Sequence, residues 1–105
     1  MSTSIYLVLT TVATREDAER LARAMVEQRL AAYAQINAID SVYRWNGALQ
    51  CEPEWRLLFK TTEAARPALQ AALRAAHPYE LPAIAALPAD AQEDFAGWVA
   101  AQVEP

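Results

Sequence analysis

Four polar side chains in the second half of the chain are the strongest candidates for chemistry: Glu54, Lys60, His77 and Tyr79. His77 is the only histidine, and an imidazole can bind a metal ion or exchange a proton near neutral pH. Glu54 and Lys60 are six residues apart, so on a regular strand their side chains share one face. We expect the four to line a cleft between subunits. Alternatively, Glu54 and Lys60 form a salt bridge that fixes an assembly and binds no ligand.

The remaining reactive groups argue against catalysis. Cys51 is the only thiol, and one thiol with one imidazole cannot complete a four-ligand site for a soft metal. The sequence contains no nucleophile–histidine–carboxylate pattern. With only two glycines it also lacks a glycine-rich phosphate loop. We therefore expect a protein that is not an enzyme.

Three aromatic residues recur at even spacing along one segment: Tyr43, Trp45 and Trp55. Aromatic residues on neighbouring strands usually pack against each other, which favours a cluster at a subunit interface. The alternative is a platform on which the ring of a ligand stacks.

Composition restricts the class of protein. A chain of 105 residues is expected to form one domain, residues 1–105. The net charge of −4 argues against nucleic acid as a partner, because a phosphate backbone requires a basic surface. The apolar run at residues 5–12 is too short to cross a membrane. A single cysteine fits the reducing cytoplasm.

The helices and strands that position these side chains can be predicted from the spacing of the apolar residues. An apolar strand at residues 5–13, buried on both faces, precedes an amphipathic helix at 14–30 that Thr14 caps. Residues 31–62 form a long hairpin, because Asn46-Gly47 suits the type I′ turn. A helix at 64–76 and a strand at 84–87 follow. Asp90 and Glu93 resemble a capping box for a final helix.

The order βαββαβ with an added C-terminal helix predicts an α+β fold, the ferredoxin-like split βαβ sandwich. The central hairpin is longer than this sheet needs, since typical strands have about five or six residues. The surplus length is available to pair with other chains, so the architecture favours an oligomer.

The chain resembles the CutA family of divalent-cation tolerance proteins over nearly its whole length. The pieces that carry this resemblance are Arg29-Leu30-Ala31-Ala32, Ser41-x-Tyr43-x-Trp45-x-Gly47, Glu54 followed by Lys60-Thr61, and His77-Pro78-Tyr79-Glu80-x-Pro82. The resemblance implies a PII-like homotrimer whose hairpins pair across subunits, with a link to copper and other divalent cations. Two positions depart from the family pattern: Tyr33 replaces the cysteine that is the family's usual copper candidate, and Ala83 replaces a glutamate.

Two functions therefore stay open. The first is metal-dependent cation tolerance, with His77 and Glu54 as the candidate ligands for copper or another divalent ion. The second is a PII-like signalling or scaffold trimer that binds a small molecule in a cleft. The candidate residues of that cleft are His77, Tyr79, Glu54, Lys60 and Tyr43, and those of the trimer interface are Trp45, Tyr43 and Trp55.

Overall fold

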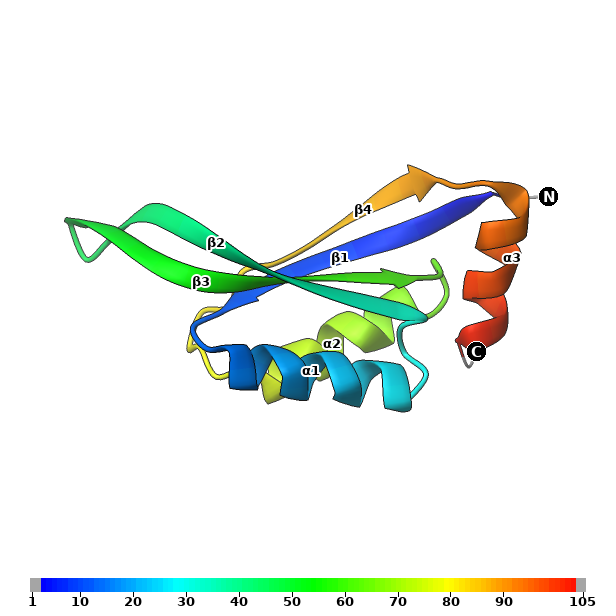
Figure 1. The fold of residues 1–105 in the computed structure, drawn as a ribbon, viewed down its shortest axis with the longest axis horizontal. Helices are drawn as coiled ribbons and strands as arrows, with labels where there is room; N and C mark the ends of the chain where they lie inside the picture. Colours follow the sequence, from blue (N-terminus) through cyan, green and yellow to red (C-terminus); the bar gives the residue numbers. More distant parts are fainter. Residues whose placement is uncertain (1–2, 104–105) are drawn as a thin grey trace.

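The computed structural model describes residues 3–103, which form one sheet with two helices along one face and a third helix at one end (Figure 1). The elements are β1 (Ser4–Val12), α1 (Arg15–Glu27), β2 (Tyr33–Trp45), β3 (Ala48–Thr61), α2 (Arg66–Ala76), β4 (Ile84–Asp90) and α3 (Glu93–Gln102). The sheet has the strand order β2-β3-β1-β4, and each neighbouring pair is antiparallel. This is the predicted ferredoxin-like α+β arrangement with a C-terminal helix added.

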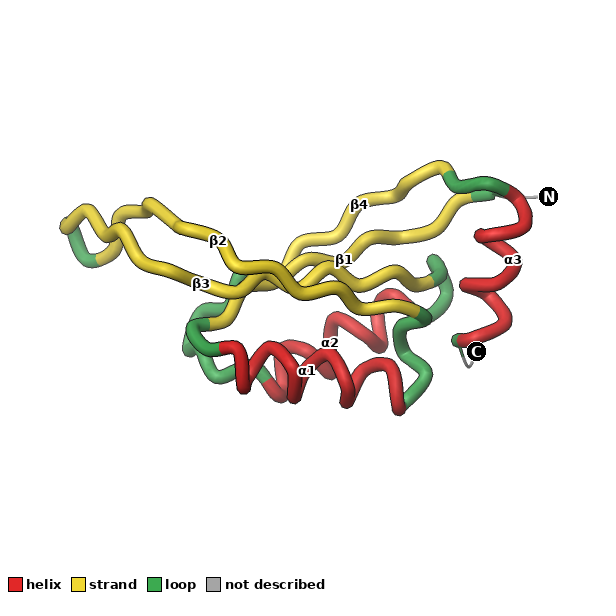
Figure 2. The backbone as a smooth tube through the Cα atoms, viewed as in Figure 1, coloured by secondary structure: helices red, strands yellow, loops and turns green. Residues whose placement is uncertain are grey.

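Helices α1 and α2 cover one face of the sheet, as the backbone trace shows (Figure 2). Thr14 caps α1 as predicted, because its hydroxyl accepts a 3.1 Å hydrogen bond from the backbone N–H of Asp17. Pro67 lies in the first turn of α2, where a missing amide donor costs nothing. The core between helices and sheet consists of apolar side chains that are fully or nearly fully buried: Val8, Val12, Ala18, Leu21, Met25, Leu57, Phe59, Leu69 and Leu73.

The second face of the sheet is covered only at one end, by α3. Ile5 is buried there among Ala96, Val99 and Val103. Leu7 and Leu9, which point the same way as Ile5, are only partly buried. The prediction that the first strand is buried on both faces is therefore wrong for most of β1 within a single chain.

The hairpin of β2 and β3 extends well beyond the sheet (Figure 1). Its register is continuous from Tyr33 opposite Lys60 to Trp45 opposite Ala48. Strand β1 pairs with β3 only between Thr61 and Trp55, so residues 40–53 form a two-stranded ribbon, here called the arm. The turn at its tip is as predicted, with φ of 51° at Asn46 and 78° at Gly47.

Pro53 occupies a position in β3 where a proline is tolerated. It lies opposite Asp40 in β2, just past the point where β1 ends. Its missing N–H therefore interrupts no ladder to a third strand, which agrees with the expected edge position.

Arg29 attaches α3 to the rest of the chain. It adopts φ of 60° just after α1, and its guanidinium donates 3.0 Å hydrogen bonds to the carbonyls of Ala101 and Gln102. A positive side chain thus satisfies carbonyls at the end of α3. The capping box predicted at the start of α3 is wrong: Asp90 ends β4, and the N-cap is Gln92, which makes no side-chain capping bond.

Candidate functional site

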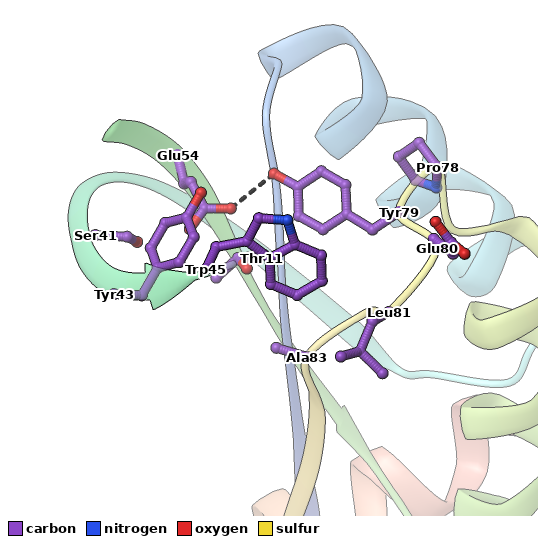
Figure 3. A pocket seen from close by; sticks show the side chains of 10 residues that line it. All are labelled: Thr11, Ser41, Tyr43, Trp45, Glu54, Pro78, Tyr79, Glu80, Leu81 and Ala83. Carbon is purple, nitrogen blue, oxygen red and sulfur yellow. Dashed lines mark hydrogen bonds between the residues drawn. The ribbon is translucent and has the colours of Figure 1, made fainter. Parts of the chain in front are cut away.

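A cleft of about 670 Å³ lies where the base of the arm meets the loop between α2 and β4 (Figure 3). We call it the arm cleft. Its lining residues are Thr11, Ser41, Tyr43, Trp45, Glu54, Pro78, Tyr79, Glu80, Leu81 and Ala83. Its volume lies within the range of small-molecule sites, roughly 300–1,000 Å³.

Strand periodicity explains how the arm supplies its share of the lining. Ser41, Tyr43 and Trp45 are odd-numbered residues of β2, so they project from one face of the ribbon. Glu54 pairs with Ile39, another odd-numbered position, and so points to the same side. Figure 3 shows Tyr43 and Trp45 directed toward the space that Tyr79 borders from the other side.

Tyr79 connects the two halves of the cleft. Its hydroxyl donates a 2.7 Å hydrogen bond to Oε2 of Glu54 (Figure 3). Desolvation, followed by this hydrogen bond and the charge of Glu54, raises the pKa of Tyr79 well above its usual value near 10. Desolvation and the charges of Glu52 and Glu54 also raise the pKa of Tyr43. Both phenols are therefore neutral at physiological pH.

His77 is in ring contact with Tyr79 but does not line the cleft. Its Nδ1 accepts a 3.1 Å hydrogen bond from the backbone N–H of Tyr79, which leaves the ring proton on Nε2. Nε2 lies 2.9 Å from Oγ1 of Thr10, so it donates to this hydroxyl. Burial lowers the pKa of His77 below 6.5, and the neutral ring is the form that satisfies both contacts.

The Thr10–His77 pair has the spacing of an activated nucleophile, but its setting is structural. Thr10 is only 2% exposed, so a substrate cannot approach its hydroxyl. The second ring nitrogen of His77 contacts a backbone amide, whereas a nucleophile–base pair needs a group that accepts the Nδ1 proton. This arrangement holds the loop against β1.

Lys60 is not brought into the arm cleft within one chain. It lies at the opposite end of the β2–β3 pairing, opposite Tyr33. Its ammonium is 4.5 Å from the centre of the Tyr33 ring and 5.6 Å from that of Phe95. Within one chain Lys60 and His77 therefore do not meet, and their meeting in a cleft between subunits stays a prediction.

The three aromatic residues grouped from the sequence separate into two environments. Trp55 pairs with the even-numbered Ala38 and packs against the core beneath the helices, with the guanidinium of Arg15 5.0 Å from its ring centre. Tyr43 and Trp45 lie on the other face, in the arm cleft. Within one chain the three residues do not pack together, because Trp55 occupies the other face of the ribbon. Their place at a trimer interface stays a prediction.

The donor groups within residues 3–103 do not fit a resident metal ion. No three His, Cys, Asp or Glu side chains in that part of the chain are grouped closely enough to hold one. Both nitrogens of His77 already have protein partners, and Glu54 accepts from Tyr79. Cys51 is exposed on the arm.

Thr11, Ser41, Glu80 and Leu81 line the cleft but were not identified from the sequence. Ser41 shares the odd-numbered face of Tyr43, so period-two reasoning would have found it. Glu80 and Leu81 directly follow Tyr79, whereas Thr11 joins the site only through sheet pairing. Within the described part of the chain, no helix is long and apolar enough to span a membrane.

Known proteins share both the sequence and the fold of this chain. A family model described as CutA1 divalent ion tolerance protein matches residues 6–102. The divalent-cation tolerance protein CutA of Thermus thermophilus is 42% identical over 95 residues, which are 89% of this chain and 92% of the relative. Protein CutA of Bos taurus is 33% identical over 91% of this chain, which spans 55% of the bovine protein.

Solved structures of CutA proteins have the same fold as this chain. The structure of CutA from Synechococcus elongatus matches with a TM-score of 0.93 and 38% identity, covering 98% of this chain and 93% of the other. A structure described as the periplasmic divalent cation tolerance protein CutA from Archaeoglobus fulgidus matches with a TM-score of 0.91 and 29% identity, covering 95% and 99%.

Proposed function

Because this chain belongs to the CutA1 family of divalent ion tolerance proteins, we propose that it acts in divalent-cation tolerance as a homotrimer without catalytic activity. The relatives named for this role match along most of the chain, and the family match covers residues 6–102. The structural feature that supports the trimer is the arm.

The arm exposes surface that a neighbouring subunit would cover. Two-stranded ribbons are marginally stable in water, yet the arm continues past the last pair between β1 and β3. It exposes large apolar side chains: Val42 is 65% exposed, Leu49 69% and Trp45 50%. The outer edges of β2 and β4 are unpaired within the described chain. Pairing the arm with neighbouring subunits in a closed ring would cover this surface and these edges.

Copper binding would depend on the assembly. The donor set within one chain does not complete a metal site, so a bound ion would need ligands from more than one subunit. We also propose a cytoplasmic location, which the single exposed cysteine fits, whereas the Archaeoglobus fulgidus relative is described as periplasmic.

The second candidate function, small-molecule binding in a PII-like trimer, is favoured by the arm cleft. The cleft has the volume of a ligand site, and half of its lining residues are aromatic or acidic.

The trimer is tested by light scattering coupled to size exclusion at micromolar concentration. We expect three times the chain mass of 11.6 kDa, and a monomer would contradict the assembly. Trp45→Ala should loosen the trimer and lower its melting temperature.

The role in cation tolerance is tested by complementation. A host without its own CutA and sensitive to copper should regain tolerance when it carries this chain. Failure of the folded, expressed chain to restore growth would overturn the role while leaving the trimer intact.

A further inference from the structure

The arm cleft has the composition of a site for a positively charged organic molecule. We propose that it binds an organic ammonium ion with an apolar body, held by the rings of Tyr43, Trp45 and Tyr79 and by the carboxylate of Glu54. This inference rests on the second candidate function, small-molecule binding in the same cleft, and names its ligand class; it does not depend on the role in cation tolerance.

The charge of the lining residues indicates that the ligand is positively charged. The ten lining residues include two carboxylates, Glu54 and Glu80, and no lysine, arginine or histidine. Glu52 lies close enough to Tyr43 to affect that phenol, which adds a third negative group near the rim. An anionic ligand would therefore be repelled, whereas a cation gains Coulomb attraction in a partly dehydrated space.

The aromatic rings of the cleft are free to contact a cation. Elsewhere the chain places its own cations over rings: Arg15 lies over Trp55, Arg66 over Tyr6, and Lys60 over Tyr33 and Phe95. Among the contacts of residues 3–103, no lysine or arginine covers the rings of Tyr43, Trp45 or Tyr79. These uncovered rings gather around one cavity (Figure 3), and aromatic groups arranged in this way attract quaternary ammonium ions.

The lining favours an organic cation over a metal ion. Hard divalent cations need several oxygen ligands at fixed distances, and the described residues offer no group of three donors. Leu81, Pro78 and Ala83 complete the wall with apolar surface, which suits carbon groups around a charged nitrogen. The carboxylate of Glu54 is held in place by the Tyr79 hydroxyl and can face the ligand without first reorganising.

The experiment is a calorimetric titration of the assembled protein with choline and with the bulkier benzyltrimethylammonium. The matched control for choline is 3,3-dimethylbutan-1-ol, which has the same shape without the charge. We expect both cations to bind, the larger one more tightly, and the neutral alcohol to bind at least tenfold more weakly than choline. Equal affinity for choline and its neutral analogue would overturn the proposal.

Variants then locate the site. Trp45→Phe keeps an aromatic ring with a weaker attraction for cations and should weaken binding severalfold, while Trp45→Ala should weaken it at least tenfold. Glu54→Gln should also weaken the two cations and leave the alcohol unaffected. Trp98→Phe, on α3, is the control and should bind like the parent.

Occupation of the cleft by a neighbouring subunit is the main competing outcome. In that case neither cation binds to the intact assembly, and the proposal is wrong even though the trimer stands. Because Trp45→Ala can disturb assembly, Trp45→Phe and Glu54→Gln are assessed only as trimers of unchanged mass. If these two trimeric variants bind the cations like the parent, the site lies elsewhere and the proposal is also overturned.

Discussion

The hydroxyl of Tyr79 donates a 2.7 Å hydrogen bond to Glu54, which joins the loop before β4 to the base of the arm. The backbone N–H of the same tyrosine donates to His77, whose ring contacts Thr10 on β1. One residue therefore links the arm, the loop and the central strand. This linkage explains how a protruding ribbon keeps a defined orientation to the sheet.

Tyr79→Phe should lower the free energy of unfolding by about 1 kcal/mol. A hydrogen bond to a charged group is lost, but both side chains are partly exposed, which reduces its worth. Urea denaturation of parent and variant at equal protein concentration measures the difference. Tyr33→Phe is the control, because the Tyr33 hydroxyl makes no hydrogen bond within residues 3–103; an equal loss in both variants would contradict the argument.

His77 should make stability depend on pH. Burial lowers its pKa in the folded state below 6.5, so the unfolded chain takes up the proton first as the pH falls. Stability contributed by the neutral ring is complete above about pH 6.5 and is lost as the pH falls through the lower folded-state pKa. Protonation of Nδ1 also breaks the bond from the Tyr79 N–H.

The measurement is urea denaturation between pH 5 and pH 8 on the parent and on His77→Gln. We expect the parent to lose stability toward pH 5 and the variant to show a flatter profile over the same range. His77 is the only histidine, so no other histidine contributes to the difference. Parallel profiles would show that His77 does not titrate as inferred.

Arg29→Ala should loosen α3. The variant loses two hydrogen bonds to the carbonyls of Ala101 and Gln102, and we expect a cost of about 1–2 kcal/mol. Arg29→Gly should be less damaging than Arg29→Ala, because glycine adopts φ of 60° without strain. Amide exchange in residues 93–102 reports the loosening, and the exposed Arg23→Ala is the control that should leave it unchanged.

Tyr33→Cys should tighten Cu(I) binding. Cu(I) prefers thiolate ligands, and a phenol with a hard oxygen is a poor substitute at pH 7. Residue 33 lies beside the ammonium of Lys60, which would favour the thiolate form of the introduced cysteine. Competition against a chelator compares the parent with the variant, both as trimers. If the parent already binds Cu(I) as tightly, position 33 does not determine copper affinity.

The local elements and their order could be predicted from the sequence. Periodicity identified every helix and strand, and the Thr14 cap and the Asn46-Gly47 turn are local interactions between residues a few positions apart. The resemblance to CutA was confirmed for the same reason, since its motifs are contiguous stretches. The start of α3 was misjudged because Asp90 was needed in the β1–β4 ladder, a pairing with Ser4 that no local pattern reveals.

The tertiary structure determines which residues meet in the candidate site. The sequence showed that Glu54 and Lys60 share a strand face, yet their separation along β3 places one at the base of the arm and the other beneath α3. Tyr79 and Glu54 are 25 residues apart and meet only because the loop before β4 folds against the arm. A shared face is a local property of the backbone, whereas a shared cleft depends on strand pairing, register and twist over long sequence distances.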